Sequence, residues 1–134
     1  MGFYLTWNGY LRKVEALIIA EFYRYLKFNE IIDVSASASY DLMSRQGDEE
    51  IHIEVKGTTT EGKSILLTKN EVKHAKDFYP KNALIVVSNI TLVKDENGKI
   101  NAEGGNTEIF QPWKLEQEYL VPLSYKYTIP EKIE

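Results

Sequence analysis

Apolar residues recur at helical spacing near the start of the chain. Over residues 10–28 they fall three or four positions apart, as on one face of an amphipathic helix, and Asn8 can serve as the N-cap. The apolar positions are Leu11, Val14, Ile18, Phe22, Tyr25 and Leu26. Glu15 lies midway between Leu11 and Ile19, near the middle of this face. The pattern therefore predicts a helix with one carboxylate directed inward, and that carboxylate requires a partner.

Two segments of alternating polarity predict a β-hairpin after a short strand at Ile31–Val34. The segments are 40–45 and 50–56, and Gly47-Asp48 fits a two-residue turn between them. This turn fixes the register, so that Asp41 faces Glu54 across the hairpin. One face then carries Tyr40, Leu42, Ile51, Ile53 and Val55. The other carries Asp41, Met43, Arg45, Glu50, His52, Glu54 and Lys56.

The rest of the chain predicts one more helix and several strands. In order, they are a strand at Ser64–Leu67, a helix at Glu71–Tyr79 ended by Pro80, a strand at Ala83–Ser88, a hairpin of Ile90–Lys94 with Lys99–Ala102, and a last strand at Tyr119–Val121. Thr68 and Glu71 have the S/T-x-x-E spacing of a capping box. The apolar run at 83–88 is typical of a central strand buried on both faces. The order α-β-β-β-β-α-β followed by further strands predicts a single α/β domain with a mixed sheet over residues 1–134.

Composition narrows the class of protein. The length of 134 residues suits one domain, and the 43% hydrophobic and 12% aromatic content excludes wholesale disorder. The absence of cysteine excludes disulfides, cysteine zinc sites and a thiol nucleophile. No stretch resembles a signal peptide or a membrane span, so we expect a cytoplasmic protein without a membrane partner.

Charge is distributed unevenly along the chain. The net charge of −4 argues against a protein that coats nucleic acid by charge alone. Residues 31–54 nevertheless hold six acids and one arginine, whereas residues 55–81 hold six lysines and three acids. The acidic and basic blocks meet at Glu54 and Lys56. The last forty residues, 95–134, carry eight acids and four lysines, which predicts a solvated acidic face.

The opposed acids of the hairpin suggest a metal site. Asp41 and Glu54 directly across a strand pair would repel each other, and a divalent cation would remove that repulsion. Their carboxylates and the carbonyl of Val55 are hard oxygen ligands of the kind that Mg²⁺ accepts, with Mn²⁺ as a substitute. Lys56 would place an ammonium group beside the metal, where it could orient a water or stabilise charge on phosphate. The alternative is an amphipathic hairpin whose outer face is merely charged.

These residues resemble a known nuclease signature. Asp41 followed by Glu54-Val55-Lys56 is similar to the D-x(n)-E-x-K motif of the PD-(D/E)XK nucleases, whose usual element order is α-β-β-β-α-β. The strings SYDLM, IEVKGTT, ILLTKNEVKHA and ALIVVSN resemble, more narrowly, the nuclease-like domain of uncharacterised function found in the plant protein NO VEIN and in many bacterial restriction-type proteins. The resemblance spans roughly residues 10–90, which predicts a restriction-endonuclease-like core and a C-terminal β extension at 91–134.

The resemblance implies roles for individual residues. Asp41 and Glu54 would ligate Mg²⁺ together with Val55, Lys56 would be the catalytic lysine, and Glu15 would supply the acid that some superfamily members contribute from the first helix. Ser39 stands where the narrower family usually has glycine.

The implied function is a metal-dependent DNA endonuclease in a defence, restriction or repair setting. One alternative is a non-catalytic nucleic-acid or protein-binding module of the same fold, acting with larger defence-system partners. Another is a structure-specific resolvase, which a chain of this length could form as a homodimer.

Other candidate residues have more ordinary interpretations. His74 lies among helical lysines, on a face that is either solvated or in contact with phosphate. Asn70 and Glu71 are interpreted as helix-start residues rather than catalytic ones. For the later aromatic residues, packing of C-terminal strands is favoured over stacking on bases; these are Trp113, Tyr119, Tyr125 and Tyr127. His52-Ile53-Glu54 has the H-x-E form of zinc deaminases, but the P-C-x-x-C string that they require is absent.

Overall fold

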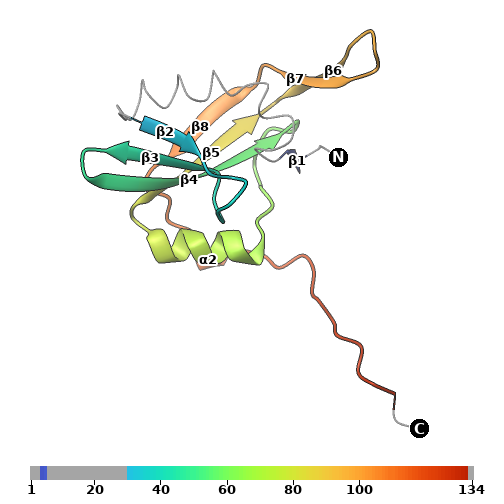
Figure 1. Ribbon diagram of the computed structural model, residues 1–134. Helices are drawn as coiled ribbons and strands as arrows, with labels where there is room; N and C mark the ends of the chain where they lie inside the picture. Colours follow the sequence, from blue (N-terminus) through green and yellow to red (C-terminus); the bar gives the residue numbers. More distant parts are fainter. Residues whose placement is uncertain (1–3, 6–29, 133–134) are drawn as a thin grey trace.

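A mixed six-stranded sheet with an α-helix across one face forms the centre of the protein (Figure 1). The computed structural model describes residues 4–5 and 30–132, and the predicted helix at 10–28, with Glu15, lies outside them. The strands follow the order β2-β3-β4-β5-β8, and β1 also pairs with β4. Their bounds are β1 Tyr4–Leu5, β2 Glu30–Asp33, β3 Leu42–Gln46, β4 Glu49–Thr58, β5 Asn82–Ser88 and β8 Asn106–Phe110.

The predicted hairpin is present in the predicted register. β3 and β4 are antiparallel, with Leu42 opposite Ile53 and Gln46 opposite Glu49. Gly47 begins the two-residue turn at a φ of 63°, in the left-handed region that glycine adopts without a steric penalty. The hairpin therefore places Asp41, which directly precedes β3, beside Ile53 and Glu54 of β4.

The helix α2, Lys69–Phe78, connects β4 to β5, which run parallel. Thr68 and Glu71 form the predicted capping box, with each side chain accepting from the other's backbone N–H. The predicted strand at Ser64–Leu67 is wrong, because this segment forms no strand. The two central strands offer it no edge, because β4 pairs with β3 and β1 on one side and with β5 on the other, and β5 lies between β4 and β8. Residues 64–67 therefore lead only to the start of α2.

The C-terminal part contains a second small sheet and one strand that the sequence pattern missed. β6, Thr91–Lys94, and β7, Ile100–Glu103, form the predicted second hairpin. The chain then returns as β8, antiparallel to β5. Gly105 permits this return at a φ of 105°, because a Cβ there would lie 2.9 Å from Cγ1 of Val87.

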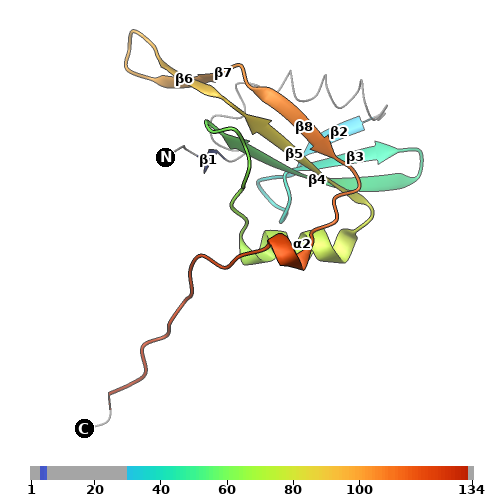
Figure 2. The same ribbon diagram turned by 180° about the vertical axis from the view of Figure 1, so that it is seen from behind.

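The predicted last strand at Tyr119–Val121 is wrong. Residues 117–119 form a 3-10 turn, η2 Gln117–Tyr119, and the chain beyond it is extended and exposed. Figures 1 and 2 show this segment projecting away from the sheet and α2.

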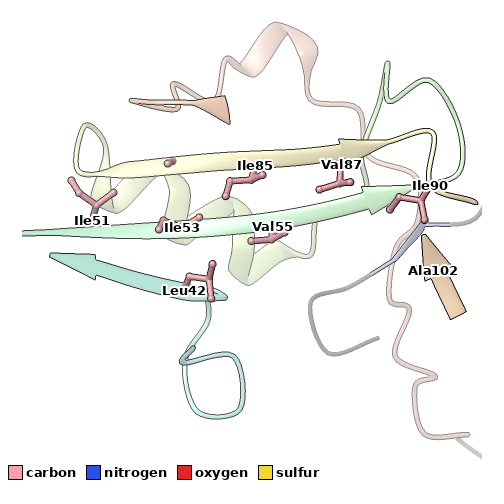
Figure 3. Packing of buried hydrophobic residues seen from close by; sticks show 9 residues of the cluster. Leu42, Ile51, Ile53, Val55, Ile85, Val87, Ile90 and Ala102 are labelled. Atoms are coloured by element: carbon pink, nitrogen blue, oxygen red, sulfur yellow. The ribbon is translucent and has the colours of Figure 1, made fainter. Parts of the chain in front are cut away.

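The hydrophobic core lies on the face of the sheet opposite α2 (Figure 3). Its members are Leu42, Ile51, Ile53, Val55, Ala83, Ile85, Val87, Ile90 and Ala102. The prediction that β5 is central and buried on both faces is confirmed, since residues 82–87 are all buried. The mixed α/β fold that the sequence predicts is confirmed as well. Within the described part of the chain, no helix is long and apolar enough to cross a bilayer.

Candidate active site

Asp41, Glu54 and Lys56 meet at the C-terminal half of β4, on the face that α2 covers. Glu54 is 7% exposed and the Lys56 side chain 12%. Asp41 lies just before β3, where its Oδ2 accepts the N–H of Val55 at 2.8 Å. In an extended strand the N–H and C=O of one residue point to the same edge, so the Val55 carbonyl is directed to the Asp41 side. The structure thus brings together the residues that the motif predicted as metal ligands.

Glu71 joins this cluster from the first turn of α2. Lys56 Nζ lies 2.8 Å from Glu71 Oε2, 3.0 Å from Glu71 Oε1 and 3.5 Å from Glu54 Oε1. The interpretation of Glu71 as a helix-start residue alone was incomplete, because the same carboxylate caps α2 and pairs with Lys56. A helix that connects two parallel strands starts near the carboxyl end of the first strand. That crossover geometry is the signal that could have placed Glu71 beside Lys56.

Burial and mutual proximity control ionisation in the cluster. Burial, a hydrogen bond with Glu71 and the charge of Asp41 together raise the pKa of Glu54 to about 10. Burial also raises the pKa of Asp41, against the opposing effect of the Val55 N–H. Burial disfavours ionised Glu71 too, but hydrogen bonds from Glu54, Lys56 and the Thr68 N–H outweigh it and lower the pKa of Glu71 to about 2. Without a cation, Glu54 therefore retains its proton at neutral pH.

The charge balance of the cluster fits a divalent cation. When all three carboxyl groups are ionised, the single ammonium of Lys56 leaves an excess of negative charge in a mostly buried site. Within residues 4–5 and 30–132, no group of three Asp, Glu or His side chains is arranged to hold a metal by itself. A metal here would accordingly take Asp41, Glu54, the Val55 carbonyl and water, and Mg²⁺ characteristically retains several waters.

A stack of four rings fixes α2 over the site. The His52 ring stacks between Tyr40, at a centroid distance of 3.8 Å, and Phe78, at 3.9 Å. His52 Nδ1 also lies 2.8 Å from Nε2 of His74, whose Nδ1 is 3.1 Å from Ser39 Oγ. Tyr40 therefore belongs to the polar face of the hairpin, and its predicted place on the apolar face is wrong, because the chain leaves the strand geometry before Leu42. His74 packs between α2 and β4, so its predicted place on a merely solvated face is wrong, whereas its contact with phosphate stays a prediction.

The segment around Trp113 covers the α2-facing side of the sheet at Asn82, the first residue of β5. Asn82 donates from Nδ2 to the carbonyls of Ala75 and Trp113, both at 3.0 Å, and accepts the Trp113 N–H at Oδ1. A cavity of about 10 Å³ remains beside Glu54 and Glu71, with Trp113 in its wall, which is roughly the room of one water. The predicted packing of C-terminal aromatic residues is wrong for Tyr119, Tyr125 and Tyr127, which are exposed.

A mixed sheet, the β4-α2-β5 crossover and the cluster of Asp41, Glu54 and Lys56 thus occur together in one α/β fold. In a comparison with protein families, the family model described as "Protein NO VEIN, C-terminal" matches residues 14–101. The chain belongs to this nuclease-like family, which confirms the resemblance found in the sequence. No match was found among curated proteins or among solved structures.

Proposed function

We propose that the protein is a Mg²⁺-dependent DNA endonuclease that serves defence, restriction or repair. The observation that carries this proposal is the buried Glu54 beside Asp41 and Lys56, at the position of the D-x(n)-E-x-K motif. A buried acidic cluster is costly to a fold that does not use it, because each unpaired charge loses its hydration. Membership of a nuclease-like family supports the same conclusion.

Asp41, Glu54 and the Val55 carbonyl would hold the metal, and Glu15 remains a proposed further acid. Bound there, Mg²⁺ would polarise the phosphate and make a coordinated water more acidic. Asp41 is already fixed by the N–H of Val55, so its carboxylate needs little reorientation. Glu54 must give up its proton first, because burial, Glu71 and Asp41 raise its pKa to about 10.

Lys56 would orient the attacking water and stabilise the reacting phosphate. Its ammonium is held by Glu71 at 2.8 Å and Glu54 at 3.5 Å, which makes it a fixed positive charge. Such a charge stabilises the additional negative charge that develops on a phosphate under attack. In the reaction, the water oxygen bonds to phosphorus, the ester P–O bond breaks, and the leaving oxygen takes up a proton while the water loses one.

The lysines of residues 56–81 would approach the DNA backbone. Lys63 and Lys73 have side chains that are 87% and 74% exposed, and Lys69 and Lys76 are exposed on α2. Several lysines are already paired, as Lys73 is with Asp77 at 2.6 Å. Because the chain as a whole is acidic, we expect weak DNA binding that falls steeply as salt concentration rises.

The first prediction is that Lys56→Ala loses at least about two orders of magnitude in the rate of Mg²⁺-dependent plasmid nicking, as expected for removal of a charge-stabilising group. Lys99→Ala, a change at an exposed lysine outside the segment 56–81, is the control and should retain activity within about threefold. Equal rates for both variants would overturn the proposed role of Lys56. Absence of nicking by wild-type protein, despite metal and DNA binding, would favour the non-catalytic binding module. A strong preference for branched over duplex DNA would instead indicate the resolvase.

A further inference from the structure

The segment after η2 is an extended arm with a strand pattern and no strand partner. We define this arm as residues 121–129. Its odd-numbered residues are apolar and highly exposed: Val121 69%, Leu123 75%, Tyr125 86%, Tyr127 77% and Ile129 76%. Its even-numbered residues are Pro122, Ser124, Lys126 and Thr128, followed by Pro130. Among the described residues, none makes a hydrogen bond or ion pair with this arm. Five large apolar side chains in a row on one side of an exposed segment indicate a surface that another molecule covers.

The two prolines show which edge of the arm can pair. In an extended strand, the N–H groups of alternate residues point to opposite edges. Pro122 and Pro130 are both at even positions, so the two missing N–H groups are on the same edge of the arm. The odd-numbered residues keep every N–H and C=O on the other edge. The arm therefore has the properties of an edge strand, with one apolar face and one edge that is free to form a ladder.

The chain also carries an edge that could receive such an arm. β8 is the last strand in the sheet order, and no described residue pairs with its outer edge. Next to it, Phe110 is 43% exposed, and a hollow of about 180 Å³ has a floor of Leu84, Val86 and Phe110 and a rim that includes Glu61, Lys63 and Glu108. A cavity of about 150 Å³ can hold benzene. The hollow therefore has room for a tyrosine ring of the arm, with polar rim groups near the phenol oxygen.

We propose that the arm binds the β8 edge of a second copy of this chain, forming a two-fold symmetric dimer. Because one chain carries both the arm and the β8 edge, each copy can place its arm on the β8 edge of the other copy. The arm points away from its own sheet in both views (Figures 1 and 2). At about 150 Å² for each tyrosine and about 100 Å² for each aliphatic side chain, two arms and the surfaces that they cover exceed the roughly 1,200 Å² of a stable specific interface.

The apolar face is tested by a pair of charge substitutions in the full chain. The dimer dissociation constant is measured by sedimentation equilibrium for wild-type protein, Tyr125→Asp and Ser124→Asp. Tyr125→Asp should raise the constant at least about tenfold, since it places a charge in the apolar contact. Ser124→Asp adds the same charge to the opposite face and should change it less than about threefold. A monomeric wild-type protein up to about 300 μM, where even a weak specific dimer would form, would overturn the proposal.

The ladder itself is tested by a pair of proline substitutions. Leu123→Pro removes an N–H from the pairing edge, whereas Ser124→Pro removes one from the edge that already contains two prolines. Only Leu123→Pro should dissociate the dimer. Equal dissociation by both variants would show that the arm does not pair as a strand.

The acceptor is tested by cross-linking, which the absence of native cysteine makes specific. A protein with Phe110→Cys is mixed under mild oxidation with proteins carrying Leu123→Cys, Tyr125→Cys or Tyr127→Cys. At least one mixture should form a disulfide heterodimer faster than either partner forms a homodimer. Cross-linking only between arm cysteines would show that the arms pair with each other and would exclude β8 as the acceptor.

Discussion

The two faces of β4 are equally buried and chemically opposite. On one face Ile51, Ile53 and Val55 are at most 4% exposed and belong to the core. On the other, His52 and Glu54 are 6% and 7% exposed, although both can carry charge. One face of this strand therefore packs in the hydrophobic core, and the other carries a cluster of ionisable groups.

This difference separates residues whose burial stabilises the fold from residues whose burial must be compensated. Apolar burial stabilises a fold in proportion to the area removed from water. Burial of a carboxylate opposes folding unless the group is paired, protonated or bound to a cation. The cluster of Glu54, Lys56 and Glu71 satisfies this requirement with an ion pair and a proton, at the place where a metal would otherwise do so.

The largest effect on stability is expected on the apolar face. Ile53→Ala removes a fully buried side chain and should lower the free energy of unfolding by about 2–5 kcal/mol, measured by urea denaturation without metal. Glu54→Gln, one position along, is the control from the polar face. The glutamine amide can donate to Glu71 as the protonated carboxyl does. The free energy of unfolding should therefore change by less than about 1 kcal/mol. A similar loss of unfolding free energy in both variants would show that the two faces of β4 contribute equally to stability.

An intermediate effect is expected on the response to metal. Wild-type protein in Mg²⁺ or Mn²⁺ at 100 times the dissociation constant should gain about 2.7 kcal/mol of stability, seen as a rise in melting temperature. The double variant Asp41→Asn, Glu54→Gln should lose this rise and be at least as stable as wild type without metal. A metal response that survives in the double variant would place the metal elsewhere.

The same comparison has a defined pH dependence. The pKa of Glu54 is raised from 4.5 to about 10, mainly by burial, so its proton stabilises the metal-free fold fully below about pH 4.5. This contribution is lost as the pH rises toward 10. The free energy of unfolding of wild-type protein should therefore fall relative to Glu54→Gln across this range, while metal affinity should rise with pH because binding displaces the proton. Parallel pH profiles for the two proteins would contradict the assigned protonation.

The smallest effect is expected for Glu71, which pairs with Lys56 and shares a hydrogen bond with Glu54. Glu71→Gln keeps an oxygen for the cap but removes the charge that holds the Lys56 ammonium at 2.8 Å. Nicking should slow by about tenfold or less, which corresponds to about 1.4 kcal/mol, with the metal-induced rise in melting temperature retained. Loss of the metal response in this variant would make Glu71 a ligand rather than a positioning residue.

Local patterns in the sequence predicted the part of the fold that local rules control. The alternation on either side of Gly47-Asp48 fixed the hairpin register, and Thr68 with Glu71 located the start of α2. The same register places Asp41, Glu54 and Lys56 together, so the motif alone predicts their cluster.

The features that the sequence did not predict correctly depend on contacts between distant segments. β8 alternates weakly and owes its strand state to pairing with β5, so its own residues carry little signal. Tyr119–Val121 has the composition of a strand, but no strand among the described residues pairs with it. Tyr40 alternates correctly with Leu42, yet it stacks on His52 because the loop before β3 turns it toward α2. Glu71 was recognised only for its local role, because its contact with Lys56 spans a crossover.

The most direct test of the account is a crystal structure of the protein soaked in Mn²⁺, with the metal located by its anomalous scattering. We expect one strong peak in contact with a carboxylate oxygen of Asp41, a carboxylate oxygen of Glu54 and the carbonyl oxygen of Val55, at about 2.0–2.3 Å. The peak should be absent from the double variant Asp41→Asn, Glu54→Gln soaked in the same way. A wild-type crystal that binds Mn²⁺ only at other carboxylates, with Glu54 still hydrogen-bonded to Glu71, would contradict the assignment of the polar face of β4 as a metal-dependent active site.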